Sequence, residues 1–132
     1  MTAPEPALVA LPMGESLAFC LRLRDGCAAE YRRRHDALWP DMRDALAAAG
    51  VLHYEIFLEP TSLLLFAFMV RRKDHTMDQL PQLAVWQRWQ SYMADLLIQE
   101  EGRPARLALD PMFRMPCSTT QTFMLPLQQP AT

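Results

Sequence analysis

The order of strand and helix signals along the chain predicts an α+β sandwich with the element order βαββαβ. Residues 17–24 and 51–58 alternate between two sets of side chains, which is the period of a strand. Residues 63–70 form a near-continuous apolar run, as expected for a central strand covered on both faces. Helical spacing of apolar residues occupies the stretches 27–50 and 81–98, so helices separate and follow these strands.

The first helical stretch is predicted to contain two short helices. Asp25 and Gly26 end the first strand, and Asp25 is a suitable cap for a helix over residues 27–35. Pro40 favours a new helix start, because its fixed backbone angle suits the first helical turn. Gly50 is a natural stop for that second helix. The apolar stripe of the second helix consists of Met42, Leu46 and Ala49.

The remaining elements complete a sheet of four strands. The short connection 59–62 predicts that the two middle strands form a hairpin. The main helix, 81–98, carries an apolar stripe made of Val85, Trp89, Met93 and Leu96. Pro111 interrupts the last strand, 107–115, which is therefore expected at a sheet edge. This order is that of a ferredoxin-like sandwich, whose second sheet face dimerises or encloses a ligand.

Composition limits the classes of function. The formal net charge of −2 argues against a broad basic surface for nucleic acid, and no stretch is long and apolar enough to span a membrane. Cys20, Cys27 and Cys117 have neither metal-ligand spacing nor the pattern of a disulfide framework. Free thiols together with nine methionines fit a reducing cytoplasm.

The length suits a single domain with one core. We expect this ferredoxin-like domain to cover residues 16–116. Residues 1–15, rich in Ala and Pro, are expected to be a loose N-terminal extension. Residues 117–132, which mix Ser, Thr, Gln and Pro, are expected to be a C-terminal tail.

The stretch from Tyr31 to Pro40 holds most of the candidate chemistry. Tyr31 and His35 are four residues apart, so on a helix they share one face. Imidazole exchanges protons near neutral pH, and phenol and indole groups suit a small polyhydroxy ligand. The simplest reaction these groups support is the opening and closing of a cyclic hemiacetal. Taken singly, each residue fits a structural role equally well, and the run from Arg32 to Arg34 is expected to be solvated surface.

Four segments, in order, resemble the L-rhamnose mutarotase family. Tyr31-Arg32-Arg33-Arg34-His35, followed by Leu38-Trp39-Pro40, resembles the family signature Y-x-x-R-H-x-x-(I/L)-W-P. Residues 53–58 and 64–67 resemble its second and third strands. Residues 86–93 are similar to its Q-R-W-W-x-Y-M helix. An ordered set of this kind is far more specific than any single motif.

The resemblance implies a cytoplasmic homodimer, a dimeric α/β barrel that interconverts the α and β anomers of L-rhamnose or a related 6-deoxy aldose. It implies neither a cofactor nor a metal. His35 is implied as the general acid that protonates the ring oxygen. The implied sugar contacts are Tyr31, Tyr54, Trp89 and Gln90. The family's tandem tryptophan is Trp89-Gln90 here, which leaves the identity of the sugar open.

Two other functions are compatible with the residues. A non-catalytic sugar-binding or dimerisation module of the same fold would be consistent with Gln90 in place of a tryptophan. A haem or small-aromatic oxygenase, with His35 or His53 as a ligand, rests on fold analogy alone. Neither nucleic acid nor a membrane is expected as a partner.

Overall fold

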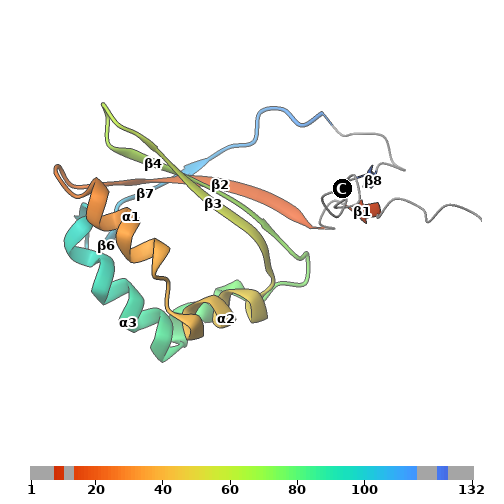
Figure 1. Ribbon diagram of the computed structural model, residues 1–132, viewed down its shortest axis with the longest axis horizontal. Coiled ribbons are helices and arrows are strands. Elements are labelled where there is room, and N and C mark those ends of the chain that lie inside the picture. The colour runs from red at the N-terminus through yellow and green to blue at the C-terminus, as the bar shows by residue number, and fades with distance from the viewer. Residues whose placement is uncertain (1–7, 11–13, 116–121, 125–132) are drawn as a thin grey trace, which may run out of the picture.

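The computed structural model describes residues 8–10, 14–115 and 122–124 (Figure 1). Its main elements are β2 (Glu15–Arg22), α1 (Ala28–Asp36), α2 (Pro40–Ala49), β3 (Val51–Glu59), β4 (Leu64–Arg71), α3 (Ala84–Met93) and β7 (Arg106–Leu109). Shorter elements are β1 (Leu8–Ala10), β5 (Gln99–Glu100), β6 (Arg103–Pro104), β8 (Thr122–Met124) and two 3-10 turns, η1 (Met77–Gln82) and η2 (Ala94–Leu96).

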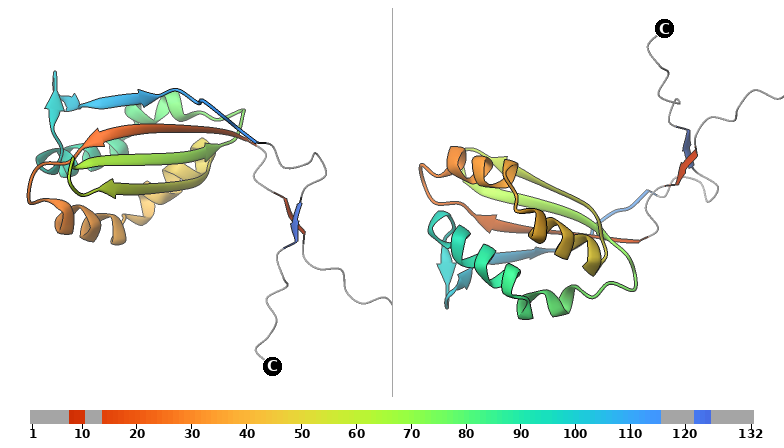
Figure 2. Two further views of the ribbon diagram at one scale, coloured as in Figure 1. Left: turned by 90° about the horizontal axis from the view of Figure 1, so that it is seen from above. Right: turned by 60° about the horizontal axis from the view of Figure 1, so that its bottom comes forward.

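The main sheet has four antiparallel strands in the order β3-β4-β2-β7. The three α-helices lie on one face of this sheet, as the views in Figures 1 and 2 show. Strands and helices alternate as βαββαβ, with the first helical segment divided in two. The predicted ferredoxin-like α+β sandwich is therefore confirmed, including the edge position of the last strand.

The division between α1 and α2 follows the predicted signals. Pro40 stands at the start of α2, and Gly50 ends it with a backbone φ of 108°, in the left-handed region that favours glycine. The predicted Asp25 cap is wrong. Cys27 is the residue that precedes α1, and no side chain caps the helix there. Asp25 lies in the turn before it, where the Cys27 amide bonds to the carbonyl of Arg24.

The main helix is shorter than predicted at both ends. Pro81 lies within η1, and Leu83 then adopts an extended backbone with ψ of 137°, so α3 begins only at Ala84. At the other end, residues 94–96 tighten into η2. The predicted stripe keeps its role despite these changes, because Trp89, Met93 and Leu96 are all buried in the core.

The last strand is also shorter than predicted, and a small ribbon precedes it. Strand β7 ends at Leu109, before Asp110 and Pro111, because proline cannot donate a ladder hydrogen bond. Strands β5 and β6 pair across a turn in which Glu101 and Gly102 have φ values of 52° and 75°. This ribbon was not predicted, because its strands are only two residues long and carry no alternation.

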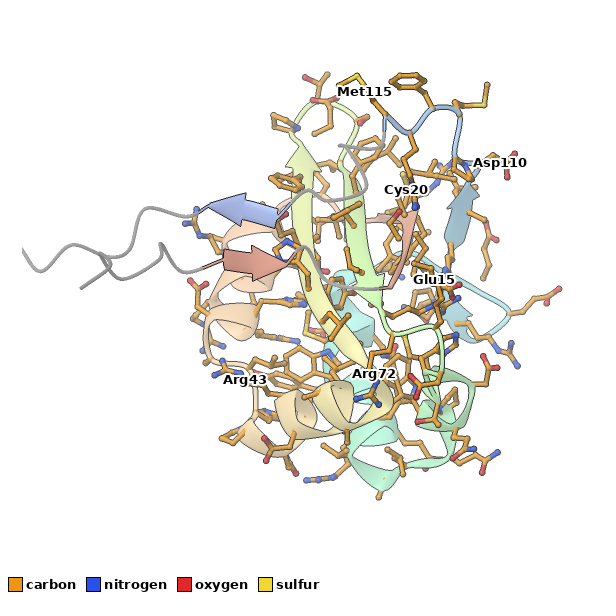
Figure 3. The ribbon with its side chains drawn as sticks, turned by 90° about the vertical axis from the view of Figure 1, so that its right-hand side faces the viewer. Glu15, Cys20, Arg43, Arg72, Asp110 and Met115 are labelled. Atoms are coloured by element: carbon orange, nitrogen blue, oxygen red, sulfur yellow. The ribbon has the colours of Figure 1, made fainter. Side chains whose placement is uncertain are left out.

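The two faces of β4 differ in exposure. Leu65, Ala67 and Met69 are buried on the helical side. Phe66 and Phe68, on the other side, are 37% and 39% exposed. Strand β4 is central, as predicted, but the described residues do not cover its second face. Figure 3 labels Cys20 on the sheet and Arg43 on the helical layer. Cys20 is the register partner of Phe66.

The segments near the two ends of the chain are described only in part. Strand β1 pairs antiparallel with β8, with Leu8 opposite Met124. The rest of the predicted N-terminal extension up to residue 13, and most of the predicted tail, lie outside the described residues. The division at residues 16 and 116 therefore stays a prediction. No helix in the described ranges is long and apolar enough to cross a membrane.

Candidate active site

A cavity of about 1510 Å³ lies between the helical layer and the sheet. Its walls come from α1, α2, η1 and α3 on one side and from all four main strands on the other. The volume exceeds the usual range for small-molecule sites, so a monosaccharide fits with room for water. The five residues predicted as the site all line it: Tyr31, His35, Tyr54, Trp89 and Gln90.

Helix α1 places Tyr31 and His35 on the cavity side, as their spacing predicted. The two rings lie 4.3 Å apart between centroids, and Tyr31 is buried. The His35 Nδ1 lies 3.1 Å from the backbone carbonyl oxygen of Tyr31. Since a carbonyl only accepts, Nδ1 carries the proton in this bond. The other ring nitrogen, Nε2, has no hydrogen-bond partner among the described residues and remains available to a ligand.

The surroundings of His35 favour its neutral form. Burial lowers the pKa of His35 below its ordinary value, and this effect outweighs the hydrogen bond to Tyr31 and the nearby Asp36, which both act in the opposite direction. A neutral imidazole with Nδ1 protonated has a lone pair on Nε2. His35 therefore has the tautomer and charge of a group that can exchange a proton through Nε2.

Helix α3 contributes the wall that faces His35. Trp89 is buried, and its ring lies 5.4 Å from His35 in an edge-on arrangement. Trp39, from the break between α1 and α2, packs edge-on against Trp89 at 5.0 Å. Tyr92 adjoins both indoles, at 5.3 Å from Trp39 and 5.7 Å from Trp89. This aromatic cluster fixes the position of Trp89 and the orientation of the His35 ring.

Strand β3 contributes Tyr54 to the sheet side of the cavity. The register partner of Tyr54 is Met69, a buried residue on the helical side of the sheet. Tyr54 itself is 37% exposed, because the cavity opens to solvent. Burial raises the pKa of both phenols, and proximity to Tyr54 raises that of Tyr31 further. Tyr31 and Tyr54 therefore remain protonated near neutral pH, as donors for a ligand oxygen.

Gln90 follows Trp89 on α3 and also faces the cavity. It is half-buried, and no hydrogen bond to its side-chain amide is present within the described residues. Trp86, one turn earlier on the same helix, lines the cavity as well. Trp86 and Gln90 therefore line the same cavity from one helix.

The arginine run divides into exposed and docked residues. The side chains of Arg32 and Arg33 are 85% and 63% exposed, as predicted. Arg34 departs from the predicted surface role, because its side chain is only 12% exposed. Its guanidinium donates to Asp95 at 2.9 Å and to Glu30 at 2.7 Å, and it stacks 4.4 Å from the centre of the Tyr92 ring. Arg34 thereby ties α1 to the end of α3.

Arg106 lines the cavity and was not predicted as a site residue. It lies on β7 opposite Leu21, on the side of the sheet that carries the helices. The alternation of Arg106 with Leu107 hinted at opposite faces, but only the observed register shows which face the arginine occupies.

His53 lies at the rim of the cavity on β3. Its Nε2 is 2.9 Å from Glu55 Oε2, and its ring packs 6.2 Å from Phe68. In the described ranges, no group of three His, Cys, Asp or Glu side chains could hold a metal ion.

Comparison with known proteins identifies what the chain is similar to. The sequence profile described as L-rhamnose mutarotase matches residues 16–115. The chain is 49% identical over 102 residues to an L-rhamnose mutarotase of Burkholderia orbicola, which covers 76% of this chain and 98% of that protein. It is 39% identical over 104 residues to an L-rhamnose mutarotase of Brucella anthropi, with 78% and 98% covered.

A solved structure agrees with these sequence relatives. The crystal structure of an L-rhamnose mutarotase from Formosa agariphila is similar with a TM-score of 0.69 and 32% identity. The similarity covers 77% of this chain and 99% of that one. The profile match includes the Tyr31–Pro40 stretch, both middle strands and α3. The chain belongs to the L-rhamnose mutarotase family.

Proposed function

We propose that this protein interconverts the α and β anomers of L-rhamnose or a related 6-deoxy aldose, with His35 as the group that exchanges a proton with the ring oxygen. The observation that carries the proposal is the position of His35. It lines the cavity between Tyr31 and Trp89, its Nδ1 is fixed by a backbone carbonyl, and its Nε2 is unoccupied by any described residue.

The reaction needs only proton transfers. In ring opening, a base removes the proton of the anomeric hydroxyl, the bond between C1 and the ring oxygen breaks, and protonated His35 donates its Nε2 proton to the ring oxygen. C1 becomes an aldehyde. After rotation about the C1–C2 bond, the C5 hydroxyl attacks the other face of C1 while neutral His35 takes the hydroxyl proton, and the protonated base returns its proton to the C1 oxygen. The lowered pKa of His35 makes its protonated form a stronger acid and its neutral form the resting state.

Four further residues are proposed to hold the sugar. Tyr31 and Tyr54 have protonated phenols and approach from opposite layers of the fold. The indole of Trp89 offers an apolar surface for the sugar ring, and the amide of Gln90 can donate and accept hydrogen bonds. Together they surround the ligand position beside His35.

The test is the rate at which anomers exchange. Magnetisation-transfer NMR on the anomeric protons of L-rhamnose, fucose, mannose and lyxose would measure exchange with and without the protein. We expect faster exchange than in buffer for L-rhamnose. No acceleration with any of the four sugars would reject the activity. Sugar-induced thermal stabilisation without faster exchange would support the non-catalytic sugar-binding module instead.

We also propose that the protein is a homodimer that joins through the uncovered sheet face. Four exposed apolar residues of this face form what we call the open-face patch: Phe66, Phe68, Leu107 and Leu109. They lie in two cross-strand rows, because Cys20 pairs with both Phe66 and Leu107, and Ala18 pairs with both Phe68 and Leu109. A contiguous apolar surface of this kind is typical of an interface, and a second copy would present a matching one.

The thiols bear on the proposed cellular setting. Cys20 is buried and Cys27 half-buried, and both are free. Burial raises the pKa of the Cys20 thiol, which makes it a poor nucleophile. Free thiols support the proposal that the protein works in a reducing cytoplasm.

A further inference from the structure

Arg106 is a strongly basic residue of the cavity wall that the proposed mechanism does not use. Arg106 lines the cavity from the edge strand β7, across the sheet from Tyr54 on the opposite edge strand β3. Its register partner, Leu21, belongs to the face of the sheet that the helices cover. The guanidinium therefore enters the cavity from the sheet side, whereas His35 enters from α1.

The guanidinium of Arg106, an exposed residue, packs over an aromatic ring. Its Cζ lies 3.8 Å from the centre of the Phe19 ring, a close cation–π distance. Phe19 lines the cavity yet is only 7% exposed. A guanidinium that already packs against a ring loses less freedom on binding a ligand than one that moves freely in solvent.

The charge of Arg106 is not neutralised by the described part of the chain. Of the three other arginines of the cavity wall, Arg32 pairs with Asp36 at 3.9 Å and Arg71 pairs with Glu15 at 2.8 Å. The third, Arg43 on α2, has no ion pair among the described residues but lies in the helical layer, away from the sheet side of the cavity. No ion pair or hydrogen bond to the Arg106 side chain is present among residues 14–115. Its N–H donors are therefore available, and the charge acts on Tyr54, whose pKa it lowers against the effect of burial.

We propose that Arg106 is a further sugar-binding residue, which donates a pair of parallel hydrogen bonds to two neighbouring hydroxyl oxygens of the aldose. The planar fork of a guanidinium matches two acceptors side by side, as in a vicinal diol, and a lysine cannot reproduce this geometry. The sugar is then held between donors on β7 and β3 and the imidazole on α1. This inference rests on the proposed mutarotase function for the identity of the ligand.

The variant that tests it is Arg106→Met, which keeps an unbranched chain over Phe19 and removes the charge and the donors. We expect the KM for L-rhamnose to rise about tenfold or more, with a smaller change in kcat, as for the loss of hydrogen bonds from a charged group. Arg106→Lys should recover only part of the loss. Arg103→Met, on the exposed ribbon outside the cavity, is the matched control and should leave KM unchanged.

Deoxy analogues separate a direct contact from a structural effect. The KM of Arg106→Met divided by the KM of the wild type is measured for sugars that lack the hydroxyl at C2, C3 or C4. This ratio should approach one for a sugar that lacks a hydroxyl contacted by Arg106, because the wild type has then lost the same hydrogen bond. An equal ratio for every analogue, or a KM within twofold of wild type for L-rhamnose, overturns the inference. If the wild-type protein does not accelerate anomer exchange, the proposed function fails. The role of Arg106 can then still be tested, because saturation-transfer NMR measures sugar binding to Arg106→Met and to the wild type. Equal binding to both proteins would then reject Arg106 as a ligand contact.

Discussion

The two faces of the main sheet come from the same strands and carry opposite kinds of surface. On β4, Leu65 and Met69 are buried and line the cavity, whereas Phe66 and Phe68 between them face away from the helices and are more than a third exposed. Successive residues of a strand point to opposite sides, so this separation follows directly from the alternation. The helical face holds polar aromatic groups around a cavity, and the other face carries the exposed apolar side chains of the open-face patch.

The two faces are proposed to have different functions, sugar binding on the helical face and dimerisation on the other. Every residue proposed to touch the sugar lies on the cavity side, and the open-face patch contributes none of them. The residues described as lining the cavity come from helices and strands of one chain. Catalysis and assembly should therefore respond independently to substitution, and the following experiments test that independence.

The largest effect is expected from His35→Gln. Loss of the proton-exchange group should slow anomer exchange by about a hundredfold or more, a usual contribution of general acid–base catalysis. Glutamine keeps a polar side chain of similar reach, so folding should be retained. The measurement is magnetisation-transfer NMR of L-rhamnose at fixed enzyme concentration.

His75→Gln is the control for this substitution. His75 lies outside the cavity wall, where its Nδ1 accepts a hydrogen bond from the Met77 amide at 3.1 Å. Exchange should stay close to the wild-type rate in this variant. An unchanged rate in His35→Gln would remove His35 from the reaction and leave the helical face with no assigned proton donor.

The next effect is expected on assembly, from Phe66→Glu. A carboxylate in the middle of the open-face patch would lose its water in the interface without a partner, so the dimer should dissociate into monomers. Since Phe66 is already 37% exposed in one chain, the monomer should still fold. Analytical ultracentrifugation measures the mass, and NMR exchange measures the activity of the same sample.

The matched control is Thr61→Glu, which adds the same charge in the exposed turn between β3 and β4. This variant should keep the wild-type mass. A dimer that persists in Phe66→Glu would show that the interface lies elsewhere. A monomer with exchange slowed more than about tenfold would instead show that the two faces are coupled.

Features that depend on neighbouring residues in the sequence were predicted well, and features that depend on tertiary contacts were predicted less well. Gly50, Pro40 and the spacing of Tyr31 and His35 act within one or two helical turns, and the structure has each as expected. The start of α3 was misplaced, because a 3-10 turn around Pro81 precedes it. The end of β7 was placed beyond Pro111, although the missing N–H of that proline ends the ladder at Leu109.

The same distinction holds within the site. The five predicted residues were placed by a local motif and by the family resemblance, and all line one cavity. Arg106 could not be predicted, because its role depends on which strand is its neighbour and in which register. The docking of Arg34 against Tyr92 and Asp95 likewise depends on contacts of α1 with α3 and η2, between residues 58 to 61 positions apart in sequence.

A smaller effect is expected from Gln90→Leu, on the cavity side of α3. Leucine has a similar volume but cannot form hydrogen bonds, so the KM for L-rhamnose should rise about two- to tenfold, as for the loss of one neutral hydrogen bond. The control is Gln87→Leu, on the same helix, because Gln87 is not among the residues that line the cavity and its side chain bonds to the Pro81 carbonyl at 3.0 Å. It should leave KM unaltered. Equal KM values for Gln90→Leu and wild type would mean that Gln90 lines the cavity without touching the sugar.

The smallest effect concerns stability against pH and isolates His35 on the cavity side. Because burial lowers the pKa of His35 in the folded chain, the unfolded chain binds more protons between that lowered pKa and about 6.5. The free energy of unfolding should therefore fall as pH decreases through this window, and His35 should contribute no slope above it. In His35→Gln this part of the slope disappears, while His75→Gln retains it. Urea unfolding at several pH values and one protein concentration measures the free energy of unfolding of each protein. If its dependence on pH is the same for His35→Gln and the wild type, the imidazole is as hydrated in the cavity as in the unfolded chain.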